Sequence, residues 1–317
     1  MRRVPQTFEG KISKNIIAGI AITTMIFIVS VHLSVFGFFC ALLLPLPVLF
    51  YRSKLGRTAG VAIPAGSVLV MAVIFGRISV DILFFSELLL AGFVLSELIE
   101  MNLSVERTVL YACGVVLLTG LAFLILHSNF SQKGIVPLVS QYVGENLRLT
   151  LMLYREMGVS EESIRIISDS LEHIQYVLVR ILPSLAVSLV LFVVWVTLLM
   201  ARPILKLRGL FCPDFGSLSL WKVPDTLVWA VIGCGGILLV PDSAFKIFGM
   251  NGLIILMMIY FFGGIAIVSF YFKKKKFPLA LRFFLYSLIA LQQFILLFVI
   301  GLGFFDMWLN FRKLEKK

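Results

Sequence analysis

The chain has 317 residues, of which 60% are hydrophobic and only 14% are charged. This composition excludes an ordinary soluble globular domain and is typical of a protein embedded in lipid. The formal net charge of +11 would indicate a nucleic-acid partner in a soluble protein. Here, however, the lysines and arginines gather in short segments between apolar runs, as in the inward-facing loops of membrane proteins, so no nucleic acid is expected as a partner.

Five apolar runs occupy the N-terminal part of the chain. A helix needs about 20 apolar residues to cross a bilayer, and the first apolar stretch, residues 15–51, is too long for one helix. A turn is therefore expected at residues 32–37. The five runs are residues 15–31, 35–50, 59–75, 82–99 and 109–126. Together they predict an N-terminal five-span membrane region over residues 1–127.

The following segment, residues 128–176, is polar and carries charges of both signs. Within them Ile164, Ile167 and Leu171 recur at helical spacing beside charged positions, which predicts an amphipathic helix. A second amphipathic helix precedes it, and Ser160 is the expected N-cap between the two. We interpret this segment as external, where it either packs on the bundle and the lipid surface or covers a ligand site.

Four further apolar runs follow in a C-terminal membrane region, residues 177–317. They are residues 177–200, 226–240, 252–272 and 283–305. The sequence thus predicts an all-α fold, a polytopic transmembrane helix bundle of about nine spans with an external amphipathic helical segment. Residues 226–240 are short and interrupted by glycines, so a re-entrant loop at this run, with eight spans in all, is the alternative.

Lysines and arginines in the short loops set the orientation of such a bundle. The basic N-terminus, residues 52–57, residues 202–222 and Lys273–Lys276 all fall on one side, which should be the cytoplasm. We therefore expect a multi-pass protein of the bacterial cytoplasmic (inner) membrane with a cytoplasmic N-terminus. Nine spans leave the basic residues 311–317 outside, whereas eight spans return them inside but move Lys273–Lys276 outside.

The sequence lacks the short motifs that carry common enzymatic chemistry. It contains no phosphate-binding G-x-x-x-x-G-K-[ST] loop, no H-E-x-x-H zinc motif and no G-x-S-x-G nucleophile elbow. Its four cysteines lie far apart, with no histidine at ligand spacing. We expect no enzymatic activity, no cofactor and no metal site, and any active transport would need a partner or an ion gradient.

Glu87 is the most informative polar residue, because it lies about 6 Å from the middle of its predicted span. A carboxylate at such a depth costs roughly 2.5 to 3.5 kcal/mol and normally faces protein or a water-filled cavity. Its depth matches that of Arg180, the predicted partner. Glu87 either contributes a structural ion pair or a protonated acid bonded to a neighbouring helix, or forms a substrate or proton site. Glu97 and Glu100, by contrast, are expected to be solvated at the cytoplasmic end.

Other polar or small residues within the spans are candidates for binding or for helix packing. Gln292 and Gln293 lie in the middle of the last run and either join helices through hydrogen bonds or contact a ligand. The glycine pair Gly263 and Gly264 either interrupts its helix at a binding site or allows close packing. Asp225 is the expected N-cap of the short run that follows it.

The C-terminal half contains the stretches "FGSLSLWKVPDTLVWAV", "NGLIILMMIYFFGGIAIVSFYFKKKKFPLALRFFLY" and "GLGFFDMWLNFRK". Through these stretches it resembles the YybS-like family of uncharacterised bacterial membrane proteins. The family pattern corresponds here to Trp221, Pro224, Asp225, Asn251, Gly263, Gly264, Asp306, Trp308 and Arg312. The family implies no settled activity. The N-terminal helices are similar to the substrate-binding subunits of energy-coupling-factor transporters, which is an analogy of fold alone.

These observations favour a transporter-like membrane protein that binds a small solute or a lipid between its helices. Glu87, Arg180, Gln292 and Gln293 are the candidate binding residues. The expected partners are membrane lipid, a small solute and another membrane protein. The alternative is a membrane scaffold that recruits envelope or division partners through the external helices and the cytoplasmic loops.

Overall fold

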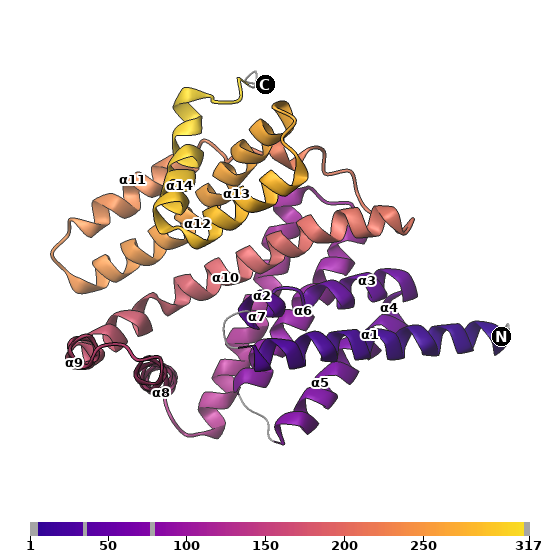
Figure 1. Cartoon of the computed structure of the whole chain (residues 1–317), viewed down its shortest axis with the longest axis horizontal. Coiled ribbons are helices and arrows are strands. Elements are labelled where there is room, and N and C mark those ends of the chain that lie inside the picture. Colours follow the sequence, from indigo (N-terminus) through magenta and orange to yellow (C-terminus); the bar gives the residue numbers. More distant parts are fainter. Residues whose placement is uncertain (1–5, 34–36, 77–79, 314–317) are drawn as a thin grey trace. The chain divides into compact units, whose positions relative to one another are not determined.

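The computed structural model describes residues 6–33, 37–76 and 80–313, and within these residues every regular element is helical. This confirms the all-α prediction (Figure 1). The first elements are α1 (Gln6–His32), α2 (Gly37–Ala41), α3 (Pro45–Leu55), α4 (Arg57–Gly60), α5 (Ala62–Phe75), α6 (Val80–Glu100) and α7 (Val105–Phe130). They are followed by α8 (Ile135–Glu156), α9 (Glu161–Asp169), α10 (Leu171–Leu207), η1 (Leu218–Leu220), α11 (Leu227–Leu238), α12 (Ser243–Lys274), α13 (Leu279–Leu291) and α14 (Gln293–Leu309).

The described residues contain seven helices, or joined helices, that are long and apolar enough to cross a membrane. The pair α13 and α14 raises this number to eight if it forms one span, but it is bent by 101° at its break. The predicted span at residues 226–240 corresponds to α11, which has 12 residues and a length of about 18 Å. The described residues therefore contain fewer helices of membrane-crossing length than the nine spans predicted. The alternative prediction of eight spans equals the upper limit of eight such helices. The turn predicted at residues 32–37 lies partly outside the described residues.

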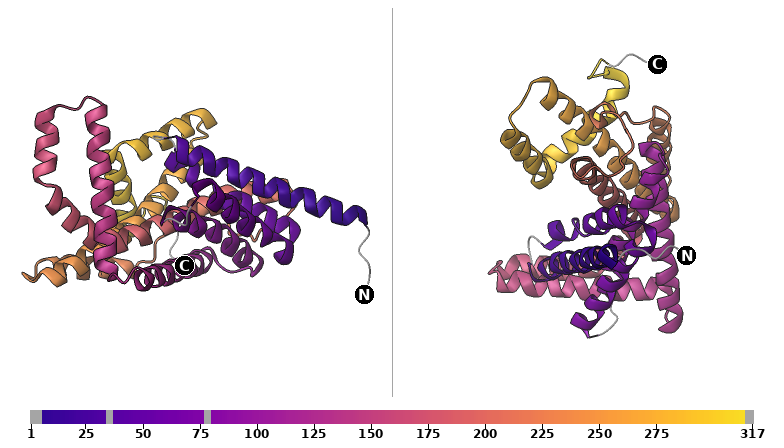
Figure 2. Two further views of the ribbon diagram at one scale, coloured as in Figure 1. Left: turned by 90° about the horizontal axis from the view of Figure 1, so that it is seen from below. Right: turned by 90° about the vertical axis from the view of Figure 1, so that its right-hand side faces the viewer.

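The chain forms two compact units, each made of two separate pieces of sequence. Unit 1 comprises Met1–Lys133 and Leu189–Phe215, and unit 2 comprises Gly134–Ser188 and Gly216–Lys317. The 37-residue helix α10 contributes its first part to unit 2 and its second part to unit 1. Helix α1 is the long indigo helix near the N label in Figures 1 and 2. The three-part division predicted from the sequence remains a prediction.

Unit 1 is built around α3 and α6, which pack closely. A Cβ atom at Gly92 of α6 would lie well inside 3.0 Å of the Pro45 carbonyl oxygen of α3, so glycine allows the two backbones to touch. Apolar side chains from α1, α3, α5 and α6 fill the surrounding core, which includes Phe27, Leu44, Val48, Ile63, Met71 and Leu89. The buried Phe27 and Phe85 rings meet edge to face at 4.9 Å. These four helices thus share one apolar core, to which Val193 of α10 also contributes.

The amphipathic segment of unit 2 forms the two helices expected from its periodicity, α8 and α9. Ser160 caps α9, because its hydroxyl accepts a hydrogen bond from the Ser163 amide. Ile164 on the apolar side of α9 is buried. The side chain of Gln175, near the start of α10, donates to the Ser140 carbonyl of α8 at 2.8 Å. The prediction of an amphipathic helix on each side of Ser160 is confirmed, but the second helix is shorter than predicted, because α9 ends at Asp169 and Leu171 begins α10.

Helices α11 and α12 form a tight hairpin in unit 2. A Cβ atom at Gly249 would approach the Cys234 carbonyl oxygen to 2.8 Å, and one at Gly252 would approach its sulfur to 2.5 Å. These glycines therefore bring the end of α11 against the beginning of α12.

An irregular segment, residues 216–226, continues this pairing along the rest of α12. Val223 touches the Cβ position of Gly263, and the hydroxyls of Ser217 and Ser219 receive hydrogen bonds from the Lys273 amine. Together, α11 and this segment contact α12 at points between Gly249 and Lys273. That distance is about 36 Å at the rise of an α-helix, longer than the roughly 30 Å hydrocarbon core of a bilayer.

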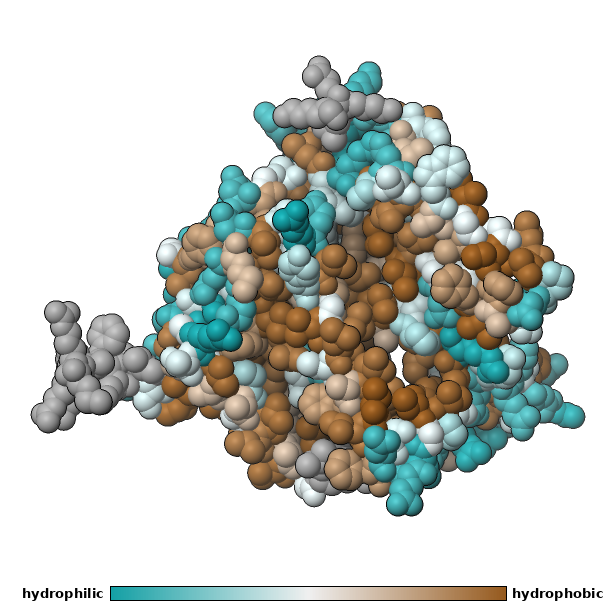
Figure 3. All heavy atoms as spheres, turned by 180° about the vertical axis from the view of Figure 1, so that it is seen from behind, coloured by the Kyte–Doolittle hydropathy of each residue, from teal (hydrophilic) through white to brown (hydrophobic). Residues whose placement is uncertain are grey.

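Many apolar side chains are exposed, as expected for a chain surrounded by lipid. Figure 3 shows them as brown areas over much of the visible face. Leu69 and Val73 of α5 and Leu118 of α7 are between 68% and 81% exposed. Apolar exposure on this scale is unusual for a soluble monomer, so these surfaces are matched to hydrocarbon rather than to water.

Candidate functional site

Glu87 lies between α6 and α7 in unit 1 and is half-buried. Its Oε2 atom is 2.9 Å from the hydroxyl of Thr119. That hydroxyl has one proton, and the carbonyl oxygens of Val115 and Val116 compete for it, also at 2.9 Å. The Oε1 atom is buried and has no hydrogen-bond partner within the described structure. Glu87 therefore retains hydrogen-bonding capacity that its described neighbours do not fill.

Arg180, the partner predicted for Glu87, belongs to unit 2 and has well-defined local contacts. Its guanidinium lies 3.2 Å from the centre of the Tyr176 ring and donates to the Tyr176 carbonyl at 3.1 Å. These contacts hold the side chain along its own helix. A pair between Glu87 and Arg180 remains a prediction.

Asn251 is one of the family-pattern residues. Its side-chain amide forms hydrogen bonds with two backbone groups of α10. The Ser184 amide donates to Asn251 Oδ1 at 3.0 Å, and Asn251 Nδ2 donates to the Arg180 carbonyl at 3.0 Å. These two backbone groups are partners in a regular α-helix. Pro183, beside them, has no amide proton to continue the ladder. The asparagine thus joins α12 to α10 at a weak point of α10, next to the candidate Arg180.

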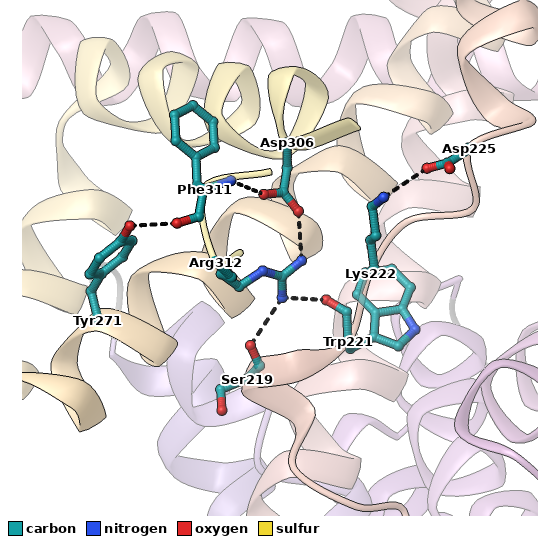
Figure 4. A network of polar contacts seen from close by, with 8 residues as sticks. All are labelled: Ser219, Trp221, Lys222, Asp225, Tyr271, Asp306, Phe311 and Arg312. Carbon is teal, nitrogen blue, oxygen red and sulfur yellow. Dashed lines mark hydrogen bonds and ion pairs between the residues drawn. The ribbon is translucent and has the colours of Figure 1, made fainter. Parts of the chain in front are cut away.

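Three other family-pattern residues, Trp221, Asp306 and Arg312, meet at the C-terminal end of α14 in a buried polar network (Figure 4). Arg312 Nη2 is 2.7 Å from Asp306 Oδ2, and the two side chains are 1% and 5% exposed. Arg312 Nη1 donates to the Ser219 and Trp221 carbonyls at 3.0 and 2.8 Å. These two carbonyl groups are not part of a regular ladder of helical hydrogen bonds. The Arg312 guanidinium therefore supplies the donors that they need.

The turn after α14 completes this network. Asn310 adopts a left-handed conformation with φ of 40°, and the Phe311 amide donates to Asp306 Oδ1 at 3.0 Å. The Tyr271 hydroxyl then donates to the Phe311 carbonyl at 2.7 Å. Asp306 and Arg312 therefore fix the chain end against α12 and the irregular segment.

The remaining family-pattern residues have simpler surroundings. The Pro224 carbonyl accepts from the Leu227 amide at the start of α11. Asp225 pairs with Lys222 at 3.1 Å, and the N-cap of α11 is Thr226, which makes no side-chain cap. The prediction of Asp225 as N-cap is therefore wrong, because its carboxylate is held by the lysine. Trp308 is exposed, and its ring meets that of Phe304 edge to face at 5.2 Å between the centres.

Gly263 and Gly264 serve close packing. A Cβ atom at Gly264 would lie well inside 3.0 Å of the Val299 carbonyl oxygen, and one at Gly303 would do the same at the Tyr260 carbonyl oxygen. The α12 helix is continuous through the glycine pair. The glycines bring α14 onto α12 and do not interrupt the helix.

Gln292 and Gln293 lie at the 101° break between α13 and α14. Both side chains are exposed. Gln292 precedes α14 without capping it. The sequence indicated a mid-span pair of amides, but it contains no proline or glycine at this break. The role of the two glutamines in binding or in helix association remains a prediction.

The sequence did not predict the ion-pair cluster at Arg52 in unit 1. Arg52 is 2% exposed, its Nε donates to Glu97 Oε1 at 2.9 Å, and its Nη1 pairs with Glu100. The Arg57 guanidinium also approaches Glu97, at 3.7 Å. The expectation of solvated Glu97 and Glu100 is wrong for Glu97, whose pair is largely enclosed. The sequence signal that could have predicted this cluster is that Arg52 and Glu97 carry opposite charges at the same predicted depth.

The described residues contain no group of three or more His, Cys, Asp or Glu side chains that could hold a metal ion. The four cysteines are free thiols. The polar groups identified above can offer hydrogen bonds and charge to a ligand, and Glu87 is the group with an unfilled acceptor.

The apolar helices of membrane-crossing length define a polytopic helical membrane protein. Residues 21–307 match the model of the family described as "Predicted membrane protein (DUF2232)", and the chain belongs to this family. Comparison with curated proteins and with solved structures gave no match.

Proposed function

We propose that this membrane protein is transporter-like and binds a small solute or a lipid between its helices, with Glu87 as the principal polar contact. The observation that carries the proposal is the incomplete hydrogen bonding of the Glu87 carboxyl group. A buried carboxyl oxygen without a donor costs free energy in an apolar surrounding. A ligand with an amine or hydroxyl group would supply the missing donor.

Replacing Glu87 with glutamine should lower retention of such a ligand about tenfold or more, because a hydrogen bond to a charged group contributes roughly 1.5 to 3 kcal/mol. Native mass spectrometry of protein purified from its own membrane measures the co-purified small molecules and lipids. Ser86→Ala is the matched control, since the Ser86 hydroxyl bonds only within α6, to the Leu83 carbonyl.

Equal amounts of every bound species in wild type and Glu87→Gln would contradict this role.

Proton coupling through Glu87 is part of the proposal, and it predicts that uptake by vesicles loses its pH dependence in Glu87→Gln. The same site is proposed to act without enzymatic turnover and without a cofactor.

A second candidate function, that of a scaffold for envelope or division partners, is supported by the exposed apolar side chains of α8. Val136, Leu149 and Met152 are each more than half exposed on this amphipathic helix. Deleting residues 141–172 separates the two functions. Loss of partner capture with intact ligand retention favours the scaffold, and the reverse favours the transporter.

We propose that the protein lies in a bacterial cytoplasmic membrane with both chain ends in the cytoplasm. The irregular segment and α11 together follow α12 for longer than the hydrocarbon core, so we count them as one crossing. The contacts of Phe311 and Arg312 with Tyr271 and Ser219 keep the chain end near Lys273. The bent pair α13 and α14 then enters and leaves on one side. These eight crossings include residues 226–240 and leave out residues 283–305, unlike the count of eight considered from the sequence. They place both Lys273–Lys276 and the basic C-terminal residues in the cytoplasm, as the positive-inside rule requires.

Reporter fusions test this arrangement. Green fluorescent protein joined after Lys317 should fluoresce, and alkaline phosphatase at the same position should be inactive, because both would lie in the cytoplasm. The control is alkaline phosphatase joined after Lys133, which should be active outside. An active phosphatase at the C-terminus would exclude the re-entrant arrangement of α13 and α14.

The more specific relationships remain predictions. The YybS-like assignment depends on the stretches quoted above. Similarity of the N-terminal helices to the substrate-binding subunits of energy-coupling-factor transporters is consistent with the proposed ligand binding. It predicts that an energising partner protein is needed for active transport.

A further inference from the structure

The end of α12 in unit 2 carries four consecutive lysines, Lys273–Lys276, all exposed. Two carboxylates lie in the adjoining structure, and both have cationic partners. Asp225 pairs with Lys222, and Asp306 pairs with Arg312. Within the described residues, none of the four lysines forms an ion pair. This end of unit 2 therefore has positive charge that its own carboxylates do not neutralise.

Two serine hydroxyl groups lie beside the amine of the first lysine. Lys273 Nζ lies 3.3 Å from Ser217 Oγ and 3.4 Å from Ser219 Oγ, and the two hydroxyls are 2.8 Å apart. Lysine ammonium and serine hydroxyl groups are donors that phosphate oxygens accept, and hydrogen bonds between charged groups are the stronger kind. The irregular segment thus adds neutral donors to the lysine run.

The backbone holds the last lysine in an uncommon conformation. Lys276 has a φ of 53°, and the Phe277 amide bonds back to the Phe272 carbonyl at 3.0 Å. This is the helix-ending turn in which glycine is the usual residue. The Phe277 ring stacks on Phe272 at 5.3 Å, and the Arg282 guanidinium donates to the Phe277 carbonyl at 2.8 Å. The turn therefore keeps Lys276 and Arg282 beside the rest of the run.

The position of Lys273–Lys276 at the end of α12 indicates which kind of ligand they bind. α12 is an apolar helix of 32 residues, so its end reaches the level of the lipid head groups. Basic clusters directly beside a membrane helix attract anionic lipids. We propose that Lys273–Lys276, with the hydroxyls of Ser217 and Ser219, bind the phosphate of an anionic lipid head group. This surface belongs to unit 2, whereas Glu87 belongs to unit 1.

The test titrates the full-length protein, purified in neutral detergent, with phosphatidylglycerol and separately with phosphatidylcholine, and counts bound lipid by native mass spectrometry. The variant K273Q/K274Q/K275Q/K276Q should bind phosphatidylglycerol at least about tenfold more weakly. Its matched control, R148Q/R155Q/R165Q/K246Q, removes the same formal charge from exposed positions elsewhere in unit 2. The control should bind phosphatidylglycerol like the wild type.

Lys276→Gly provides a second variant that does not endanger folding, because glycine suits the left-handed position. It should melt at the same or a higher temperature and bind phosphatidylglycerol about fivefold more weakly. Equal binding of the two lipids by the wild type would overturn the proposal, as would equal weakening in the control variant. Displacement of phosphatidylglycerol by millimolar inorganic phosphate would also overturn it, since the site would then serve free phosphate.

Discussion

Replacing Arg312 with alanine is expected to destabilise unit 2 by about 3 to 5 kcal/mol, the usual cost of breaking a buried ion pair from one side. The change leaves Asp306 as an uncompensated buried carboxylate. It also leaves the Ser219 and Trp221 carbonyls without the donor that Arg312 provides. The cost therefore combines an unpaired charge with two unsatisfied backbone acceptors.

Tryptophan fluorescence during thermal unfolding in detergent measures this effect, since Trp221, Trp229 and Trp308 all belong to unit 2. Lys313→Ala is the control, because its exposed side chain should contribute less than about 0.5 kcal/mol. Asp306→Asn should also destabilise unit 2, and the double variant should cost less than the two single changes added together. A wild-type melting temperature for Arg312→Ala would show that the network does not support the fold.

Replacing Gly264 with alanine is expected to separate α14 from α12. The added methyl group would collide with the Val299 carbonyl, a backbone atom that no change of rotamer can move. Overpacking of a fitted core typically costs about 1 to 3 kcal/mol, and more where it forces the backbone to shift. Gly303→Ala should have a similar effect, through the Tyr260 carbonyl.

Gly301 supplies the matched control for both glycine variants. It lies in the same helix as Gly303, but a Cβ atom there would meet nothing within 4 Å. Gly301→Ala should therefore leave unit 2 unchanged or stabilise it by about 0.5 to 1 kcal/mol, because alanine favours the helix. Thermal unfolding compares the three variants. Similar melting temperatures for Gly264→Ala and Gly301→Ala would contradict close packing at Gly264.

Apolar run length and periodicity were sufficient to predict most helices of this protein. Residues 82–99 became α6, the amphipathic segment became α8 and α9, and Ser160 capped α9 as its position indicated. These features depend on local chemistry, which neighbouring residues determine. The side of the C-terminus was left open, because it depended on whether residues 226–240 cross the membrane or form a re-entrant loop.

Features that join distant segments were not predictable in the same way. Sequence gives the depth of a charged residue but not its neighbour, so the pairing of Arg52 with Glu97 was missed although both were placed at the cytoplasmic end. The contacts of the irregular segment were not predicted, since the carbonyl groups of Ser219 and Trp221 are satisfied by Arg312, 91 to 93 residues further along the chain. The 101° bend at Gln292 has no glycine or proline signal.

The insertion of Asn251 into α10 has a consequence for the order of synthesis. Ser184 leaves the ribosome 67 residues before Asn251. While α10 is the newest span in the membrane, the Ser184 amide therefore has only its own helix to bond to. Once α12 has been synthesised, the asparagine amide adds two hydrogen bonds between the helices. This part of α10 therefore depends for two of its hydrogen bonds on a segment that is translated later.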